Sequence, residues 1–278
     1  MVDEISTELL PTPPQSSVAR ARATLRYYLP AILLLPAGLI VWELIVRIFN
    51  IQGFLLPAPS LIGQTFADNA TALIDRGLYT FQEALAGYVL GCGLGIIFGM
   101  ITARFKTLSS AFMPFAIAIN AIPIIALSPL ARIWFGIDQA SKVVIVAILC
   151  FFPVLISTVR GLTSVSPSAL NLMRSYATPD MEVFQKLRLP AALPFIFTGL
   201  KVCTSLSLIG AIVAEFYGGL VNRSLGTYIA NEASQIRFRN SWSGILVACV
   251  LGILFYLVVS LIERLAIPWH VSVRRRAE

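Results

Sequence analysis

Long apolar segments alternate with short polar ones along most of this chain. A membrane-spanning helix needs about 20 predominantly apolar residues, and six segments meet that requirement. Because lipid offers no partner for backbone N–H and C=O groups, spanning segments of this kind are helical. The pattern therefore predicts an all-α fold, a polytopic membrane helix bundle of about six transmembrane helices: Leu29–Phe49, Tyr79–Ala103, Ser109–Phe135, Ala140–Gly161, Leu189–Phe216 and Ser241–Pro268.

The composition supports this interpretation. Of the 278 residues, 57% are hydrophobic and only 13% are charged, whereas soluble domains carry about 45–50% apolar and about 25% charged residues. So few charges cannot cover a water-facing surface, and so apolar a chain cannot stay solvated without packing. An ordinary soluble globule and a disordered chain are both excluded.

The basic residues indicate how the bundle is oriented. We expect a polar N-terminal tail over residues 1–28, a transmembrane domain over residues 29–270 and a basic tail over residues 271–278. Lys and Arg are more frequent in the loops on the side of the N-terminus, which predicts that both tails are cytoplasmic. The net charge of +7 is scattered between apolar runs. It therefore fits an anionic lipid surface rather than nucleic acid.

Two of the predicted spans have unusual small or helix-breaking residues. Gly87, Gly91, Gly95 and Gly99 recur at four-residue spacing, which lets two helices approach closely. The third span contains three prolines, which remove backbone hydrogen bonds and bend helices. Such a break is either a structural kink or the lining of a translocation pathway. The candidate lining residues are Asn120, Pro123 and Ser128.

Ionisable residues inside a membrane are costly and call for a partner or a function. Glu43 and Arg47 are four residues apart and predict a local ion pair. Glu83 begins the second span and is expected to lie at the membrane interface. The long side chain of Lys201 can reach the inner surface of the membrane. Glu215, near the outer end of the fifth span, is a candidate for a gate, a docking contact or a marker of the interface.

The sequence carries no recognisable catalytic or metal-binding motif. Its cysteines occur singly within apolar segments, and its one histidine lies near the C-terminus, so we expect core or lipid-facing cysteines and no metal site. None of the lysines ends a G-x-x-x-x-G-K-[ST] phosphate-binding loop. We therefore expect no catalytic residue and no cofactor in this chain. The cysteines are Cys92, Cys150, Cys203 and Cys249.

The longest predicted cytoplasmic connection, residues 163–188, has the pattern of a helix–turn–helix. Ser166 before Pro167 is typical of a helix start, and Thr178-Pro179-Asp180 predicts a break and a second start. Apolar residues recur at three-residue spacing in both halves. Such a face is explained by docking into a groove on a partner, or by folding back on the bundle. The apolar positions are Leu170, Met173, Tyr176, Met181, Phe184 and Leu187.

This order of elements resembles the permease subunits of bacterial ABC importers. Their motif reads E-A-A, three residues, Gly, nine residues, Ile, one residue, Leu-Pro. Here Asn171-Leu172-Met173 stands at E-A-A, Ala177 at Gly, Leu187 at Ile, and Leu189-Pro190 at the end. Alanine at the glycine position makes a left-handed turn less expected. The sequence around the motif shows a stronger resemblance than the motif itself, to the nitrate/sulfonate/taurine-type permeases, over about residues 40–270. The runs that carry it are Pro57–Ser60, Ile133–Gly136, Ser141-Lys142, Phe151–Pro153, Leu189–Pro194, Phe197–Lys201 and Ala214–Phe216.

The resemblance implies partners and a function. Such permeases pair with a second permease copy, as a homo- or heterodimer, in the bacterial inner membrane. Each copy carries an ABC ATPase subunit that binds ATP and Mg, and an extracytoplasmic solute-binding protein delivers the substrate. The cytoplasmic helix–turn–helix acts as a coupling helix in the ATPase. The residues expected to touch the ATPase are Arg174, Ser175, Tyr176, Ala177, Thr178, Pro179, Asp180 and Met181.

The substrate class stays open at the level of sequence. A few runs resemble permeases for riboflavin or a thiamine-pyrimidine precursor. The alternative within the same importer class is nitrate, taurine, a sulfonate or an aromatic carboxylate. An ion-coupled secondary transporter is less favoured, because neither an inverted repeat nor paired intramembrane carboxylates are evident in the sequence.

Overall fold

The computed structural model describes residues 17–136, 138–216 and 223–269, and all regular structure in these ranges is helical. This confirms the expected all-α class. Residues 1–16 of the predicted N-terminal tail lie outside the described residues, as do residues 270–278, which include the whole predicted C-terminal tail. The elements are α1 (Ser17–Ile48), α2 (Pro59–Asp68), α3 (Ala70–Arg104), α4 (Lys106–Asn120), η1 (Ile124–Leu127), α5 (Ser128–Phe135), α6 (Gln139–Thr163), α7 (Pro167–Ser175), α8 (Asp180–Val183), η2 (Phe184–Arg188), α9 (Leu189–Phe216), α10 (Leu225–Ser234) and α11 (Phe238–Ala266).

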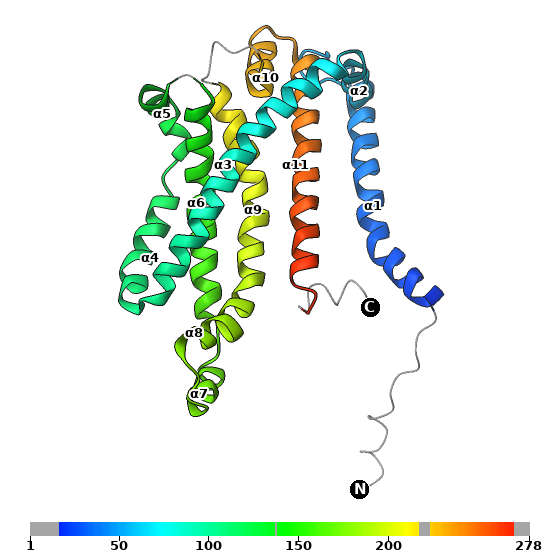
Figure 1. Ribbon diagram of the computed structural model, residues 1–278. Coiled ribbons are helices and arrows are strands. Elements are labelled where there is room, and N and C mark those ends of the chain that lie inside the picture. Colours follow the sequence, from blue (N-terminus) through cyan, green and yellow to red (C-terminus); the bar gives the residue numbers. More distant parts are fainter. Residues whose placement is uncertain (1–16, 137, 217–222, 270–278) are drawn as a thin grey trace.

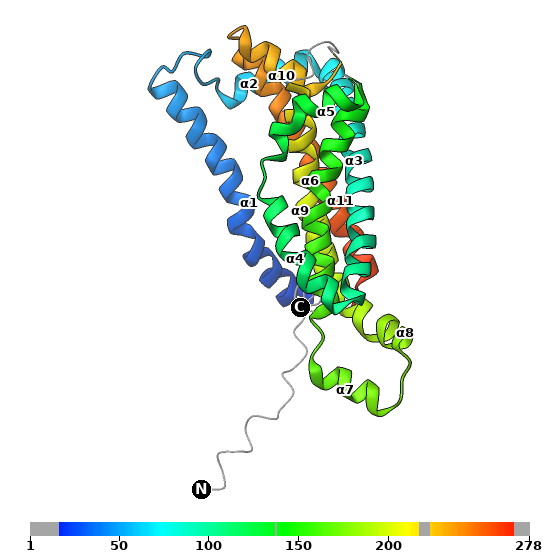
Figure 2. The ribbon, with the colours of Figure 1, turned by 90° about the vertical axis from the view of Figure 1, so that its left-hand side faces the viewer.

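The bundle is built from long helices that run side by side (Figures 1 and 2). Among the described residues, four helical segments are long and apolar enough to cross a membrane: α3, α6, the segment Asp180–Phe216 that ends in α9, and α11. The first predicted span forms part of α1, whose Trp42 ring packs edge-on against Trp242 of α11 at 5.2 Å between centroids. The short helices α2, α5 and α10 gather at one end of the bundle, and α7 and α8 lie at the other.

The third predicted span is not one continuous helix, and on this point the sequence prediction was wrong. α4 ends at Asn120, the 3₁₀ turn η1 follows, and α5 begins at Ser128. Pro123 lies in the break, where its missing N–H costs nothing, and Pro129 occupies the first turn of α5. Pro114 is tolerated inside α4. Two of the three prolines therefore mark helix ends rather than bends within a helix.

The four-residue glycine spacing packs α3 against α6, as predicted. A methyl group on Gly91 would lie 2.2 Å from the carbonyl oxygen of Ala147, and one on Gly95 would lie 2.7 Å from that of Phe151. Those separations are far below a van der Waals contact. Only a residue without a side chain allows the two backbones to approach this closely.

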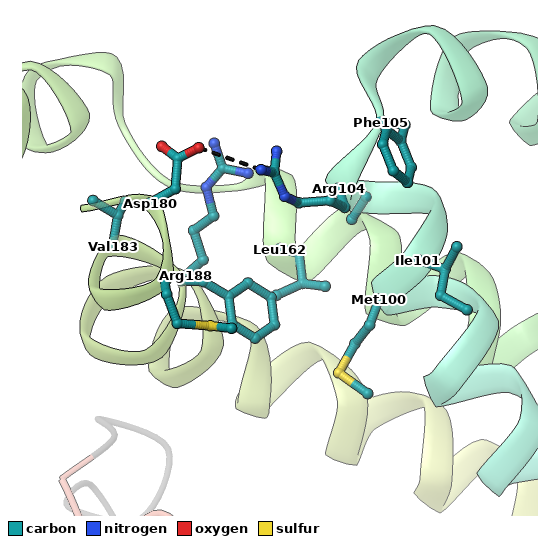
Figure 3. Close-up of a pocket in the computed structure, with 11 residues that line it drawn as sticks. Met100, Ile101, Arg104, Phe105, Leu162, Asp180, Val183 and Arg188 are labelled. Carbon is teal, nitrogen blue, oxygen red and sulfur yellow. Dashed lines mark hydrogen bonds and ion pairs between the residues drawn. The ribbon is translucent and has the colours of Figure 1, made fainter.

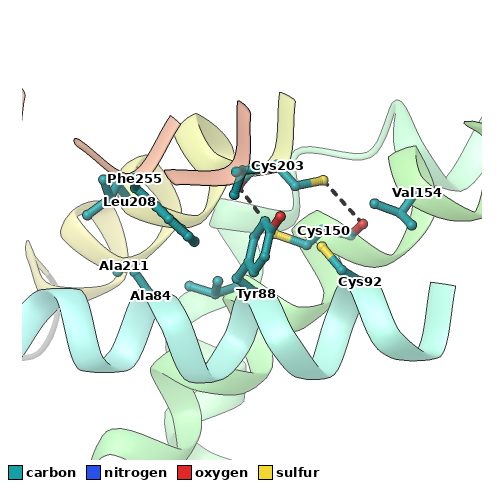
Figure 4. Packing of buried hydrophobic residues seen from close by; sticks show 11 residues of the cluster. Ala84, Tyr88, Cys92, Cys150, Val154, Cys203, Leu208, Ala211 and Phe255 are labelled. Carbon is teal, nitrogen blue, oxygen red and sulfur yellow. Dashed lines mark hydrogen bonds between the residues drawn. The ribbon is translucent and has the colours of Figure 1, made fainter. Parts of the chain in front are cut away.

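Three of the four cysteines meet in the centre of the bundle (Figure 4). Cys92, Cys150 and Cys203 come from α3, α6 and α9 and are buried, while Cys249 is exposed. The thiols of Cys150 and Cys203 donate to each other's carbonyl oxygens at 3.7 and 3.5 Å. Cys92, Cys150 and Cys203 are thus core residues, as expected. Their sulfur atoms lie within 4.8 Å of one another, a proximity that could not be predicted from the sequence.

Candidate functional site

The segment between α6 and α9 forms the predicted helix–turn–helix. Ser166 caps α7, since its Oγ accepts a hydrogen bond from the Ala169 N–H at 3.3 Å, and Pro167 occupies the first helical position. Pro179 precedes α8 in extended conformation. These are the start signals read from the sequence, and both helices begin where the signals place them.

The turn between the two helices is left-handed despite the absence of glycine. Ala177 has φ of 51°. Its N–H donates to the Arg174 carbonyl at 2.9 Å, and the Thr178 N–H donates to the Met173 carbonyl at 3.2 Å. This pair of hydrogen bonds is the Schellman motif that ends many helices, in which glycine is usual at the left-handed position. The expectation that alanine would disfavour such a turn here was wrong.

Substitution of Ala177 by glycine is expected to stabilise this turn. The left-handed conformation costs a non-glycine residue about 1–2 kcal/mol, so glycine should slow amide exchange at residues 177 and 178 roughly fivefold. Hydrogen exchange measured by mass spectrometry on peptides covering the turn reports this directly. Ala169→Gly is the matched control, because glycine inside α7 costs about 1 kcal/mol and should speed exchange. Equal changes in both variants would contradict the assignment.

The helix–turn–helix projects from the bundle instead of lying against it (Figures 1 and 2). α7 contains no buried residue, and Tyr176 and Met181 are 76% and 66% exposed. Val183 is buried, and Phe184 packs against a cluster of α3, α6 and α9 side chains that includes Leu162. One end of the predicted apolar stripe therefore anchors the segment, and the other end is presented to the surroundings.

One ion pair ties the projecting segment to α3. The Arg104 guanidinium lies 3.3 Å from the Asp180 carboxylate, and both side chains are largely exposed (Figure 3). An exposed pair of this kind contributes little to stability, about 0–1 kcal/mol.

Glu215 lies inside the other end of the bundle, where α3, α9 and α10 meet. Its carboxylate accepts hydrogen bonds from Thr80 Oγ1 at 2.8 Å and from the Gly226 N–H at 2.6 Å. Thr80 Oγ1 in turn accepts from the Leu225 N–H at 2.9 Å. Glu215 and Thr80 thus satisfy the free N–H groups in the first turn of α10, and they hold α10 on the bundle.

A second buried charge lies beside this cap. Glu83, on α3, is fully buried and accepts from Lys142 Nζ of α6 at 2.8 Å, and its carboxyl group also contacts that of Glu215. The interpretation of Glu83 as interfacial was wrong: the carboxylate faces α6, 59 residues away in sequence, rather than the surface. Lys142 is a residue that sequence reasoning did not single out as a partner.

The predicted pathway residues occupy two different environments. Asn120 and Pro123 are exposed on the described chain, on either side of the bend that follows α4, whereas Ser128 and Glu215 are fully buried. Only the first two are therefore accessible from outside the described chain. The break between α4 and α5 is the part of this set that a transported solute could contact.

Glu43 and Lys201, the other charged residues singled out from the sequence, are also paired. Glu43 and Arg47 form the predicted ion pair, and Glu43 also accepts from the Ser60 N–H at 3.0 Å, which links α1 to α2. Lys201 pairs with Glu263 of α11 at 2.8 Å. This second pair joins residues 62 apart, so a single sequence could not reveal it.

A bundle of long apolar helices with one broken span and a projecting helix–turn–helix defines a polytopic membrane protein. The comparisons agree: residues 95–269 match the family model of the binding-protein-dependent transport system inner membrane component. The chain belongs to that family, and it is a permease subunit of an ABC importer for small solutes.

Named relatives cover nearly the whole chain. The formylaminopyrimidine transport permease protein ThiX of Halalkalibacterium halodurans is 30% identical over 84% of this chain and 92% of ThiX. The riboflavin transport system permease protein RibX of Chloroflexus aurantiacus is 29% identical over 91% of this chain and 96% of RibX. The putative aliphatic sulfonates transport permease protein SsuC of Bacillus subtilis is 31% identical, over 86% and 87%.

A solved structure shares the fold. A chain from the MetNI methionine ABC transporter, in inward-facing conformations, superposes with a TM-score of 0.50 at 16% identity, covering 75% of this chain and 97% of that one. At this identity the likeness concerns the architecture alone.

Proposed function

We propose that residues Arg174–Met181 are the surface through which a separate ATP-binding-cassette subunit drives this bundle. The observation that carries the proposal is the exposure of Tyr176 and Met181 on a segment that projects from the protein. Exposed aromatic and methionine side chains on a rigid helical element are typical of interface anchors. The Ser166 cap, the Ala177 turn and the packing of Phe184 determine the position of the Tyr176 and Met181 side chains.

The proposal assigns the chain its place in an assembly. The projecting segment and both termini face the cytoplasm, and the helix bundle lies in the bacterial inner membrane beside a second permease copy. ATP and Mg bind the cassette subunit, and an extracytoplasmic binding protein delivers the solute to the end that carries α5 and α10. ATP binding then shifts the population of inward-open and outward-open bundles, because the two conformations contact the cassette subunit differently.

The experiment is a double substitution of the exposed anchors. Tyr176→Ala with Met181→Ala, in the permease co-expressed with its ATPase and reconstituted in liposomes, should lower solute-stimulated ATP hydrolysis at least tenfold, since truncating an interface anchor costs about 2 kcal/mol or more. Leu257→Ala is the control, because Leu257 is 55% exposed and lies within α11, away from both ends of the bundle. Unchanged stimulation in the double variant, with normal folding, would refute the proposal.

For the solute, we propose riboflavin or a thiamine-pyrimidine precursor, entering along the break between α4 and α5. The names of ThiX and RibX support this choice. Uptake of labelled riboflavin, formylaminopyrimidine and taurine by the same proteoliposomes, with the cognate binding protein added, separates the alternatives. Transport of taurine alone would contradict the proposal.

One observation favours a small anion as the second candidate. Arg132 of α5 has a buried Nε with no hydrogen-bond partner among the described residues. A guanidinium group with an unpaired Nε–H in the second half of the broken span is suited to a sulfonate or carboxylate. In this case Arg132→Gln should abolish uptake of the anion and leave uptake of a neutral solute unchanged.

A further inference from the structure

A cavity of about 480 Å³ opens between the end of α3 and the segment that contains α8 and η2 (Figure 3). This volume lies within the range of small-ligand sites. One wall is apolar, made by Met100, Ile101 and Phe105, of which the last two are largely exposed. The cavity therefore has room for a ligand and a surface that favours a hydrocarbon chain.

The mouth of the cavity carries more positive than negative charge. Arg104 and Arg188 both line it, and Asp180 is the one acidic residue among the lining residues. Asp180 pairs with Arg104 at 3.3 Å, while Arg188 has no hydrogen-bond or ion-pair partner among the described residues. Figure 3 shows both guanidinium groups directed toward the Asp180 side of the cavity. A half-buried guanidinium without a partner favours an anionic ligand.

The position of the two arginines along their helices narrows the chemistry of that ligand. Arg104 is the last residue of the spanning helix α3, and Arg188 immediately precedes α9. Basic residues at helix ends lie at the level of phospholipid headgroups, and the cytoplasmic leaflet is anionic. Met100 and Ile101 continue the apolar wall from this level toward the membrane interior along α3, as an acyl chain would.

We propose that this cavity binds an anionic phospholipid of the cytoplasmic leaflet, with its phosphate between Arg104 and Arg188 and an acyl chain along Met100 and Ile101. The bound phosphate competes with Asp180 for Arg104, and Asp180 belongs to Arg174–Met181, the proposed coupling segment. Bound lipid therefore alters how the coupling segment is held against α3. Two points of this inference rest on the proposed function: that the segment lies on the cytoplasmic side, and that it couples the bundle to the ATPase.

The test measures lipid binding to the full chain without the ATPase. Delipidated permease in detergent is titrated with phosphatidylglycerol or phosphatidylcholine and followed by native mass spectrometry. We expect phosphatidylglycerol to bind preferentially, and Arg188→Gln to weaken its binding about tenfold, since the loss of one charge-assisted contact has this magnitude. Arg264→Gln is the matched control, because Arg264 lies in the last turn of α11 and does not line the cavity.

Three outcomes would overturn the inference. Equal binding of both lipids excludes an anionic headgroup site, and an equal loss in Arg264→Gln shows only general attraction to a basic surface. Displacement of the lipid by millimolar inorganic phosphate would indicate a free-phosphate site instead. Failure of the coupling proposal is distinguishable, since it would appear as unchanged ATPase stimulation in the Tyr176 and Met181 variants while lipid binding to Arg188 persists.

Discussion

Gly91→Ala is expected to destabilise the bundle by about 3 kcal/mol or more, at the upper end of the cost of overpacking. The added methyl group would lie 2.2 Å from the Ala147 carbonyl oxygen and 2.8 Å from its Cα. Both atoms belong to the backbone of α6, so no side-chain rotation can relieve the clash. α3 and α6 must move apart, and this weakens the interfaces of Gly87, Gly95 and Gly99 at the same time.

A second glycine on the same helix supplies the control. Gly93 has no atom within 4 Å of the place where its Cβ would stand. There alanine only improves helix propensity, by about 0.5–1 kcal/mol. Unfolding of the two variants in detergent, followed by loss of helical circular dichroism against denaturant, should therefore shift in opposite directions. Equal stability of both variants would show that α3 and α6 are not in contact through Gly91.

Features that repeat along the chain could be predicted from the sequence. The four-residue glycine face and the Ser166-Pro167 start each express a local rule, and the structure bears out both of them. The apolar spans are helical as predicted, but the third is not continuous. The break at Pro123 was visible as an irregularity, but whether it bends or ends a helix depends on what packs around it. Sequence alone could not decide between these outcomes.

Features that depend on distant partners were not predictable. Glu83 and Lys142 are 59 residues apart, and Thr80 and Glu215 are 135 apart. Nothing in one sequence shows that two such residues face each other. The left-handed Ala177 turn was missed for a different reason, since two backbone hydrogen bonds stabilise a conformation that alanine alone disfavours.

The two buried networks and the projecting segment lie at opposite ends of the same helices. α3 carries Thr80 and Glu83 near one end and Arg104 at the other, and α9 runs from the coupling segment to Glu215. Because α3, α6 and α9 are packed through glycine contacts, and α3 and α6 also through the buried Lys142–Glu83 pair, we expect a displacement of the coupling segment to be transmitted along these helices. This arrangement gives the proposed ATPase contact a direct mechanical route to α10.

Lys142→Met is expected to destabilise the protein by about 3–5 kcal/mol. The Lys142 and Glu83 side chains are 5% and 0% exposed and lie 2.8 Å apart. Removing one partner of a buried ion pair leaves an uncompensated charge, which costs far more than the pair contributes. Glu83→Gln in the Lys142→Met background should restore much of the loss, because the remaining group is then neutral. Denaturant unfolding of the single and double variants completes a double-mutant cycle.

Lys186→Met tests whether burial is the cause of this effect. Lys186 and Glu182 form an ion pair of similar length, 2.6 Å, but their side chains are 67% and 46% exposed. Water screens an exposed pair, so its loss should change stability by no more than about 0.5 kcal/mol. Comparable losses in Lys142→Met and Lys186→Met would mean that the Glu83 carboxylate is reached by solvent. A large loss of stability in Lys142→Met alone would show that the buried Lys142–Glu83 pair is essential to the end of the bundle where α10 is held.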